Sequence, residues 1–113
     1  MMKKKEMVVI LNAQNASGQN GKATLLDVGG KTKVMISVAS GASGVAQPAH
    51  IHVGACPNPG EVKYPFTSPI NGTSKTMLDV TLMKLKEEFP LAINVHKSAQ
   101  EAKVYVACGD LKF

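Results

Sequence analysis

The chain has no tryptophan and no arginine, and only 4% of its 113 residues are aromatic. The core must therefore be built from aliphatic side chains. All 13 basic residues are lysines, and the formal net charge is +5. Sequence-specific DNA-binding proteins rely on the bidentate arginine fork, and single-strand binders rely on aromatic stacking platforms. Because this chain lacks both, we expect no nucleic acid among its partners and interpret the basic charge as a solvated surface.

Long apolar runs are also missing. No stretch approaches the roughly 18–20 apolar residues that a membrane-spanning helix needs, so we expect no membrane span. The apolar run Met7–Leu11 is shorter than the about 7–15 residues of a secretory signal, and no signal peptide is visible in this chain. We expect a basic N-terminal tail over residues 1–6 and one domain over residues 7–113, since a chain of this length supports a single core.

Short segments of alternating apolar and polar residues make up most of the chain, and clusters of Gly, Pro, Asn and Ser separate them. Lys31–Val38 alternates most clearly, with Thr32, Val34, Ile36 and Val38 on the expected core face. The expected strands are Met7–Leu11, Lys22–Val28, Lys31–Val38, Ala49–Gly54, Glu61–Tyr64, Ser74–Leu82, Leu91–His96 and Ala102–Cys108.

Two short helical segments are expected between these strands. Met83–Phe89 reads as a short helix that Pro90 closes, and Ser98 with Glu101 fits the capping pattern of a single helical turn. Seven or eight short strands with such connections predict an all-β fold. We expect a Greek-key antiparallel β-sandwich or flattened barrel.

All three histidines of the chain, His50, His52 and His96, lie in expected strands. Side chains alternate along a strand, so His50 and His52 share a face, opposite Ile51 and Val53. Because the aliphatic residues must be the buried set, we expect the imidazoles to project outward from the sandwich.

The strand Leu91–His96 has a matching phase, in which Ile93 and Val95 point one way and Asn94 and His96 the other. Three outward imidazoles on two strands are either three unrelated surface residues or the ligands of one metal ion. Imidazole suits copper, zinc, nickel and iron, and the order of affinities favours copper among divalent ions. Three protein ligands also leave one coordination position open.

The two cysteines, Cys56 and Cys108, offer several interpretations. Cys108 shares its phase with Val104 and Val106 and is therefore expected to point inward. A disulfide between the cysteines would close a loop of about fifty residues, which is worth roughly 3–4 kcal/mol in the chain-entropy model. Two independent thiols and a copper–thiolate bond to Cys56 are the alternatives. We favour the disulfide, which would indicate an oxidising, extracytoplasmic compartment, periplasmic or secreted.

Three blocks of the sequence carry a resemblance to a known family. Ala49–His52 (AHIH), Asn94–Lys97 (NVHK) and Ala107–Asp110 (ACGD) resemble, in the same order, blocks of the copper-zinc superoxide dismutases. The related superoxide-dismutase-like and CHRD-type domains are similar as well. The resemblance covers about residues 7–111 and is strongest from Gln47 onward. It implies a Greek-key β-barrel with copper on its outer face.

The resemblance also implies a ligand set and a cysteine pairing. The copper would be held by the His50-x-His52 pair together with His96, and a disulfide would join Cys56 to Cys108. Zinc is a conceivable substitute for the copper ion. Because members of this family often dimerise, a homodimer is a further expectation.

The sequence departs from the family pattern at the zinc site and at the substrate-guiding residue. Active members carry a bridging histidine and zinc ligands in the loop after the first cysteine, whereas Pro57–Asn71 has no histidine and a single acidic residue, Glu61. The guiding arginine, three residues before the last cysteine, is replaced by Tyr105. Tyr105 and Asn94 share the outward phase, so both are candidates to lie near the metal.

We therefore expect a protein that holds one copper ion through three histidines, in a binding, storage or undefined redox role. One alternative is a zinc-free, copper-only dismutase in which Lys63 and Lys97 partly replace the attraction for an anion. A second is a structural or interaction module with vestigial histidines. Because the guiding arginine and the bridging histidine are absent, superoxide dismutase activity is expected to be weak or absent.

Overall fold

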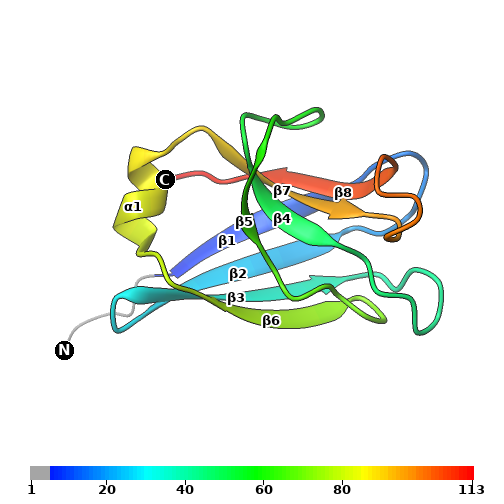
Figure 1. Ribbon diagram of the computed structural model, residues 1–113, viewed down its shortest axis with the longest axis horizontal. Helices are drawn as coiled ribbons and strands as arrows, with labels where there is room; N and C mark the ends of the chain where they lie inside the picture. The colour runs from blue at the N-terminus through cyan, green and yellow to red at the C-terminus, as the bar shows by residue number, and fades with distance from the viewer. Residues whose placement is uncertain (1–5) are drawn as a thin grey trace.

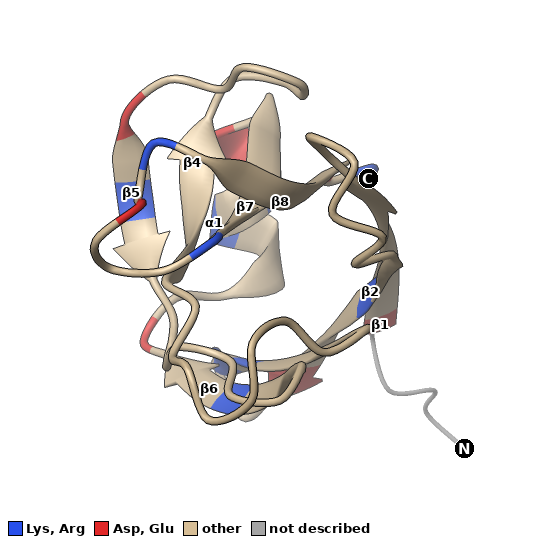
Figure 2. Ribbon diagram, turned by 90° about the vertical axis from the view of Figure 1, so that its right-hand side faces the viewer, with Lys and Arg blue, Asp and Glu red and all other residues tan. Residues whose placement is uncertain are grey.

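The computed structural model describes residues 6–113, so the predicted N-terminal tail lies outside the described residues except for Glu6, which begins the first strand. Eight antiparallel strands form one sheet that curls into a flattened, nearly closed barrel (Figures 1 and 2). One short α-helix lies at one end of it. The predicted all-β antiparallel fold is confirmed. Within the described part of the chain, no helix is long and apolar enough to cross a membrane.

The elements follow one another along the chain with short connections. They are β1 (Glu6–Ala13), β2 (Gly21–Val28), β3 (Lys31–Val38), β4 (Ala49–Val53), β5 (Val62–Pro65), β6 (Thr73–Leu78), α1 (Leu82–Glu87), β7 (Leu91–His96) and β8 (Tyr105–Asp110).

The order of the strands in the sheet is β5-β4-β7-β8-β1-β2-β3-β6. Three connections therefore join strands that are not neighbours in the sheet, from β3 to β4, from β5 to β6 and from β6 through α1 to β7. They give the Greek-key arrangement that the pattern predicted. In Figure 1, β1, β2, β3 and β6 form one layer, and β4, β5, β7 and β8 form the other.

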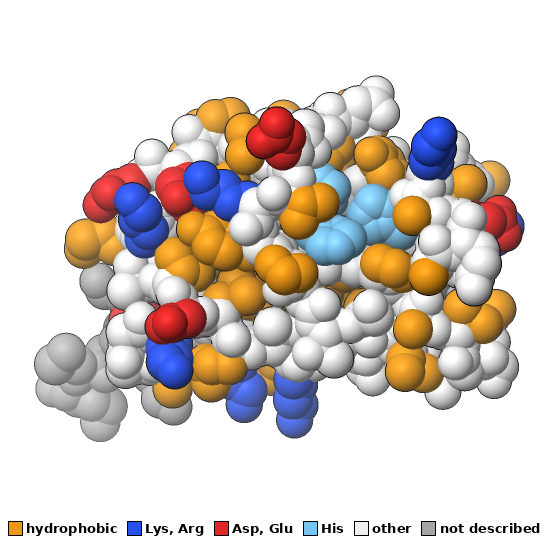
Figure 3. All heavy atoms as spheres, viewed as in Figure 1, with side chains coloured by type: hydrophobic (Ala, Val, Ile, Leu, Met, Phe, Trp, Pro, Cys, Tyr) orange, Lys and Arg blue, Asp and Glu red, His pale blue; other side chains and the backbone are white. Residues whose placement is uncertain are grey.

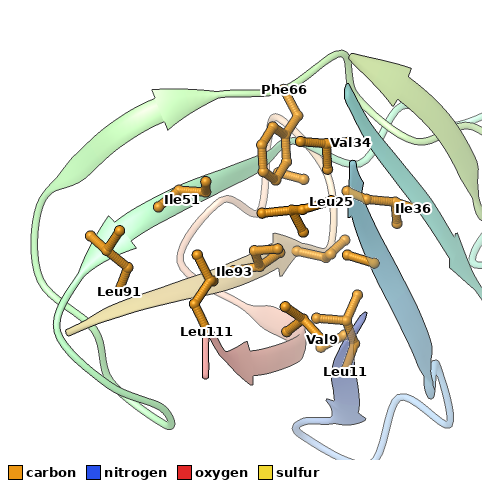
Figure 4. Close-up of a cluster of buried hydrophobic side chains, with 14 of the residues drawn as sticks. Val9, Leu11, Leu25, Val34, Ile36, Ile51, Phe66, Leu91, Ile93 and Leu111 are labelled. Carbon is orange, nitrogen blue, oxygen red and sulfur yellow. The ribbon is translucent and has the colours of Figure 1, made fainter. Parts of the chain in front are cut away.

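The core between the layers is almost entirely aliphatic, as the scarcity of aromatic residues predicted. Leu25 and Val34 from one layer face Ile51 and Ile93 from the other (Figure 4), and each of the four is at most 1% exposed. Phe66 is the one aromatic side chain of this buried cluster. Because the inward residues of both layers are consumed by this core, a functional site must be built on the outer faces or in the connections.

The predicted strand Ser74–Leu82 is shorter than expected. β6 ends at Leu78, and the side chain of Thr81 caps α1 by accepting a hydrogen bond from the backbone N–H of Lys84 at 2.9 Å. The helix buries Leu85 completely against the core. The alternation of apolar and polar residues continues beyond Leu78, but there it leads into the capped start of α1. The apolar residues of this segment point inward although they are not part of a strand.

The last predicted strand, Ala102–Cys108, is also shifted, because β8 starts at Tyr105. The residues before it form turns, in which the Ser98 hydroxyl accepts from the backbone N–H of Glu101 at 3.0 Å. The predicted capping contact is present, although the segment makes a turn and no helix.

A β-bulge in β8 overturns one predicted orientation. His96 pairs with Tyr105 but Val95 pairs with Ala107, so one extra residue stands in β8. Beyond the bulge, Cys108 lies opposite Asn94 on the outer face of the sheet. The prediction that Cys108 points inward is therefore wrong, although the residue is buried.

Candidate metal centre

The three histidines lie on two neighbouring strands of the upper layer, His50 and His52 on β4 and His96 on β7. One ring nitrogen of each lies within 4.8 Å of the others, and the ring centroids are 5.1–5.6 Å apart. In Figure 3 the imidazoles form a single pale blue group among apolar and uncharged side chains. The structure thus brings together the three residues that the strand phases singled out.

The rings project from the outer face of the sheet, as predicted, but two of them are covered. His52 is only 4% exposed and His96 only 6%, whereas His50 is partly exposed. The cover comes from two connections, residues 54–61 between β4 and β5 and residues 97–104 between β7 and β8. Residues of both connections contact the rings directly.

Backbone carbonyl groups in these connections orient two of the rings. The Nδ1–H of His52 donates to the carbonyl of Gly60 at 2.9 Å, and the Nδ1–H of His96 donates to the carbonyl of Ala102 at 2.5 Å. A carbonyl can only accept, so Nδ1 must carry the proton in both rings. Each Nε2 therefore carries a lone pair, which is the arrangement seen around metal-binding histidines.

The third ring turns its other nitrogen toward the cluster. His50 Nδ1 lies 3.2 Å from His96 Nε2. Since His96 Nε2 carries a lone pair, the proton between them must belong to His50 Nδ1 as long as no cation is bound. A metal ion would take the place of this proton. The donor set that the geometry offers is therefore His50 Nδ1, His52 Nε2 and His96 Nε2.

The environment of the rings favours their neutral form. Burial, together with the neighbouring His96 and His52, lowers the pKa of His50 from 6.5 to about 4. Burial also lowers the pKa of His96, although the Ala102 carbonyl acts against it. Only neutral imidazole binds a metal, so this site is prepared for a cation at neutral pH.

The donors present fit a metal ion that prefers nitrogen. His52 Nε2 is buried and has no hydrogen-bond partner among residues 6–113. Buried polar atoms are rarely left unpaired, and a metal ion would satisfy this one. Three imidazoles without a carboxylate suit copper or zinc better than magnesium or calcium.

The two cysteines form the predicted disulfide, Cys56–Cys108, and neither thiol is free. Two independent thiols and a copper–thiolate bond to Cys56 are therefore both excluded for this state of the protein. A disulfide is typical of an oxidising, extracytoplasmic environment. The disulfide also fixes the 54–61 connection over β8, where the backbone N–H of Cys56 donates to Asp110 Oδ1 at 2.8 Å.

Both residues predicted to lie near the metal are adjacent to the histidines. Tyr105 pairs with His96 across β7 and β8, and their ring centroids are 5.1 Å apart in an edge-to-face arrangement. Asn94 pairs with His50 and is fully buried. The sequence phase placed both residues on this face, but it gave no sign that Asn94 would be covered.

The two lysines considered as attractors for an anion are paired with carboxylates. Lys63 Nζ lies 3.1 Å from Glu88 Oε2, and Lys97 Nζ lies 3.2 Å from Glu101 Oε2. Their charges are therefore largely offset, and a focused positive field at the histidines is not expected from them.

The carbonyl groups of Gly60 and Ala102 are the part of the site that could not be predicted from the sequence. Every residue has a backbone carbonyl, so the residue type gives no sign of which one accepts a hydrogen bond from a histidine.

No protein-family model, curated protein or solved structure matches this chain. The fold and the site alone therefore define its class. It is a small, disulfide-bonded antiparallel β-barrel with three clustered histidines on one outer face that can hold a metal ion.

Proposed function

We propose that the protein binds one copper ion through His50 Nδ1, His52 Nε2 and His96 Nε2, and that it serves to bind or store copper or to carry it in a redox role. The observation that carries this proposal is the preorganised donor set. One ring nitrogen of each histidine lies within 4.8 Å of the others, and two of the rings are held by backbone carbonyls.

A structural explanation of the histidines accounts for less. Two buried imidazoles could simply fill space under the connections, but His52 Nε2 would then remain a buried acceptor without a partner. Leaving such a group unsatisfied costs about 1–3 kcal/mol. A bound cation removes this cost, and it takes the place of the proton between His50 Nδ1 and His96 Nε2.

Copper is favoured over zinc by two arguments. At a site of nitrogen donors the order of affinities places copper above the other divalent first-row ions. The resemblance of the AHIH, NVHK and ACGD blocks to the copper-zinc superoxide dismutases points to the same metal and to a fold of that kind. When bound, copper supplies one-electron redox chemistry, and zinc would supply none.

A zinc-free dismutase is the second candidate, because three protein ligands leave one position open for a small molecule. Several features speak against efficient turnover. Tyr105 stands where the resemblance expects a guiding arginine, the segment 57–71 holds no histidine, and Lys63 and Lys97 are paired with carboxylates. Binding or storage therefore explains the site better than catalysis.

The test is a copper titration of the metal-free protein, with Cu(II) in air and with Cu(I) under anaerobic conditions. We expect one equivalent to bind, with nitrogen hyperfine structure in the electron paramagnetic resonance spectrum of the Cu(II) form. His52→Ala should weaken binding by about 100-fold or more, because one of three ligands is lost. Ser37→Ala, on an exposed position of β3, is the matched control and should bind like the wild type.

The outcomes separate the candidates. If neither oxidation state binds stoichiometrically, the proposal is wrong and the histidines are structural. If copper binds and the loaded protein consumes superoxide rapidly, the dismutase replaces the binding role. Metal-free His52→Ala should retain its fold by circular dichroism, which shows that lost binding reflects the ligand.

A further inference from the structure

Asn94 is an unusual residue for its place in the barrel. It lies in the middle of β7 and is fully buried, yet neither its Oδ1 nor its Nδ2 has a hydrogen-bond partner among residues 6–113. Asparagine is depleted in strands, and buried amides are nearly always paired. A buried carboxamide with both ends unpaired therefore requires an explanation that the protein part alone does not provide.

The register places Asn94 beneath the three imidazoles. It lies directly opposite His50 on β4, two residues before His96 on its own strand, and one diagonal step from His52, which pairs with Ala92. Directly opposite side chains on one face have Cβ atoms about 4.5–5.5 Å apart, and diagonal neighbours remain within reach. Asn94 is thus the residue of β7 that has all three histidines as neighbours on its face of the sheet.

The other neighbour of Asn94 does not satisfy it. On β8 it lies opposite Cys108, whose sulfur is bonded to Cys56 and is at best a weak acceptor. The unpaired amide and the unpaired His52 Nε2 therefore belong to one buried region of the outer face. Both are explained together if something other than protein occupies it.

We infer that the carboxamide of Asn94 holds a water molecule on the metal ion bound by the three histidines. This inference rests on the proposed function. Carboxamide oxygen suits hard cations such as magnesium and calcium and is a poor ligand for copper, so we assign the amide to the water and not to the ion. A water can both donate to Oδ1 and accept from Nδ2, whereas direct coordination would leave Nδ2 unpaired. Asn94 is in this role a positioning residue.

Asn94→Val is the variant that tests the inference, because valine suits a strand and carries no polar atom. The metal-free variant should be at least as thermally stable as the wild type, since two unpaired buried groups disappear. Its copper affinity should fall about tenfold, in the range typical of residues that support metal ligands indirectly. The exchangeable-proton coupling of the Cu(II) form in H₂O against D₂O, measured by electron–nuclear double resonance, should decrease.

Ser74→Ala is the matched control. The Ser74 hydroxyl is another buried group without a partner, but it lies on β6 in the opposite layer. Removing it should change neither the copper affinity nor the exchangeable-proton signal. This control separates the general effect of removing an unpaired buried polar group from a specific effect on the metal centre.

Each result decides between the two proposals. If wild-type protein binds copper and Asn94→Val shows the same affinity and proton coupling, the role of Asn94 is refuted while the copper site stands. If the wild type binds no copper, both proposals fall. Should Asn94→Val not fold, Asn94→Ala replaces it in the same comparison. A large loss of metal-free stability in both, with unchanged spectra, would show that Asn94 is structural.

Discussion

The outer faces of the two layers of the barrel differ in how far their residues are buried. On β3 the outward residues Lys31 and Ser37 are exposed and Lys33 and Met35 are half-buried, so burial alternates along the strand. On β7 every residue is buried, including the outward-facing Ala92, Asn94 and His96. The same strand geometry therefore yields an ordinary surface in one layer and a second, polar interior in the other.

The difference is made by the connections and not by the strands. Residues 54–61 and 97–104 fold over β4 and β7, and each contributes a carbonyl, from Gly60 and from Ala102, to one histidine ring. When a connection covers the outer face of a sheet, the polar groups beneath it lose their contact with water. Such a face must then either carry no polar residues or receive hydrogen-bond partners from the connection. Here the connections cover two imidazoles and an amide and leave the third imidazole partly exposed, which is why we assign the covered face to the function.

The largest effect on stability should come from placing a charge on the covered face of β7, and the same charge on the exposed face of β3 is the comparison. Ala92→Lys buries an ammonium group opposite His52 and should reduce the free energy of unfolding by about 4–5 kcal/mol, because an unpaired buried charge is among the most destabilising changes. Ser37→Lys on β3 should change it by less than about 0.5 kcal/mol. Urea unfolding measures both. Equal effects at the two positions would remove the distinction between the layers.

Releasing the cover should have the next largest effect. Replacing both cysteines, Cys56→Ser with Cys108→Ser, removes a bond across 52 residues and should cost about 2–4 kcal/mol of unfolding free energy. Copper affinity should fall as well, because the connection that carries the Gly60 carbonyl is no longer fixed. Calorimetry and copper titration of the double variant test this. Unchanged affinity in a destabilised protein would separate the disulfide from the site.

Acidification should destabilise the covered face in a defined pH window. The pKa of His50 is lowered from 6.5 to about 4 in the folded protein, so between these values the unfolded chain binds more protons. The free energy of unfolding of the metal-free protein should therefore fall as the pH drops from about 6.5 to about 4, and the lowered pKa of His96 acts in the same direction.

The matched variant for this prediction is His50→Gln, which cannot titrate. The difference in unfolding free energy between wild type and His50→Gln should change with pH within this window and be constant above about pH 7. A difference that is constant from pH 7 to pH 4 would contradict the lowered pKa.

The smallest effect is expected at the exposed face. Lys31→Ala on β3 removes a solvated outward side chain, and the free energy of unfolding should stay within about 0.5 kcal/mol of the wild type. Copper binding should be unaffected. A clear loss of stability at this position would mean that the face of β3 is covered in solution, for example by a second copy of the chain.

The sequence by itself determined the all-β class, the faces of the clearly alternating strands and the candidate ligands. Alternation along Lys31–Val38 fixed its buried residues, since a period of two can place only one set inward. The same rule put His50, His52 and His96 on the opposite face from the aliphatic residues. Because only aliphatic residues were available to form the core, this face had to be the outer one. These are local properties, and short-range geometry is enough to predict them.

Only the tertiary structure decided what happens to that outward face. The β-bulge in β8 moved Cys108 to it, because an inserted residue reverses the phase of the strand beyond it and leaves no mark in the alternation. The carbonyls of Gly60 and Ala102 approach the rings from distant positions, and every residue has a carbonyl, so the sequence does not single these out. The isolation of Asn94 is likewise a property of its neighbours, which exist as neighbours only once the chain has folded.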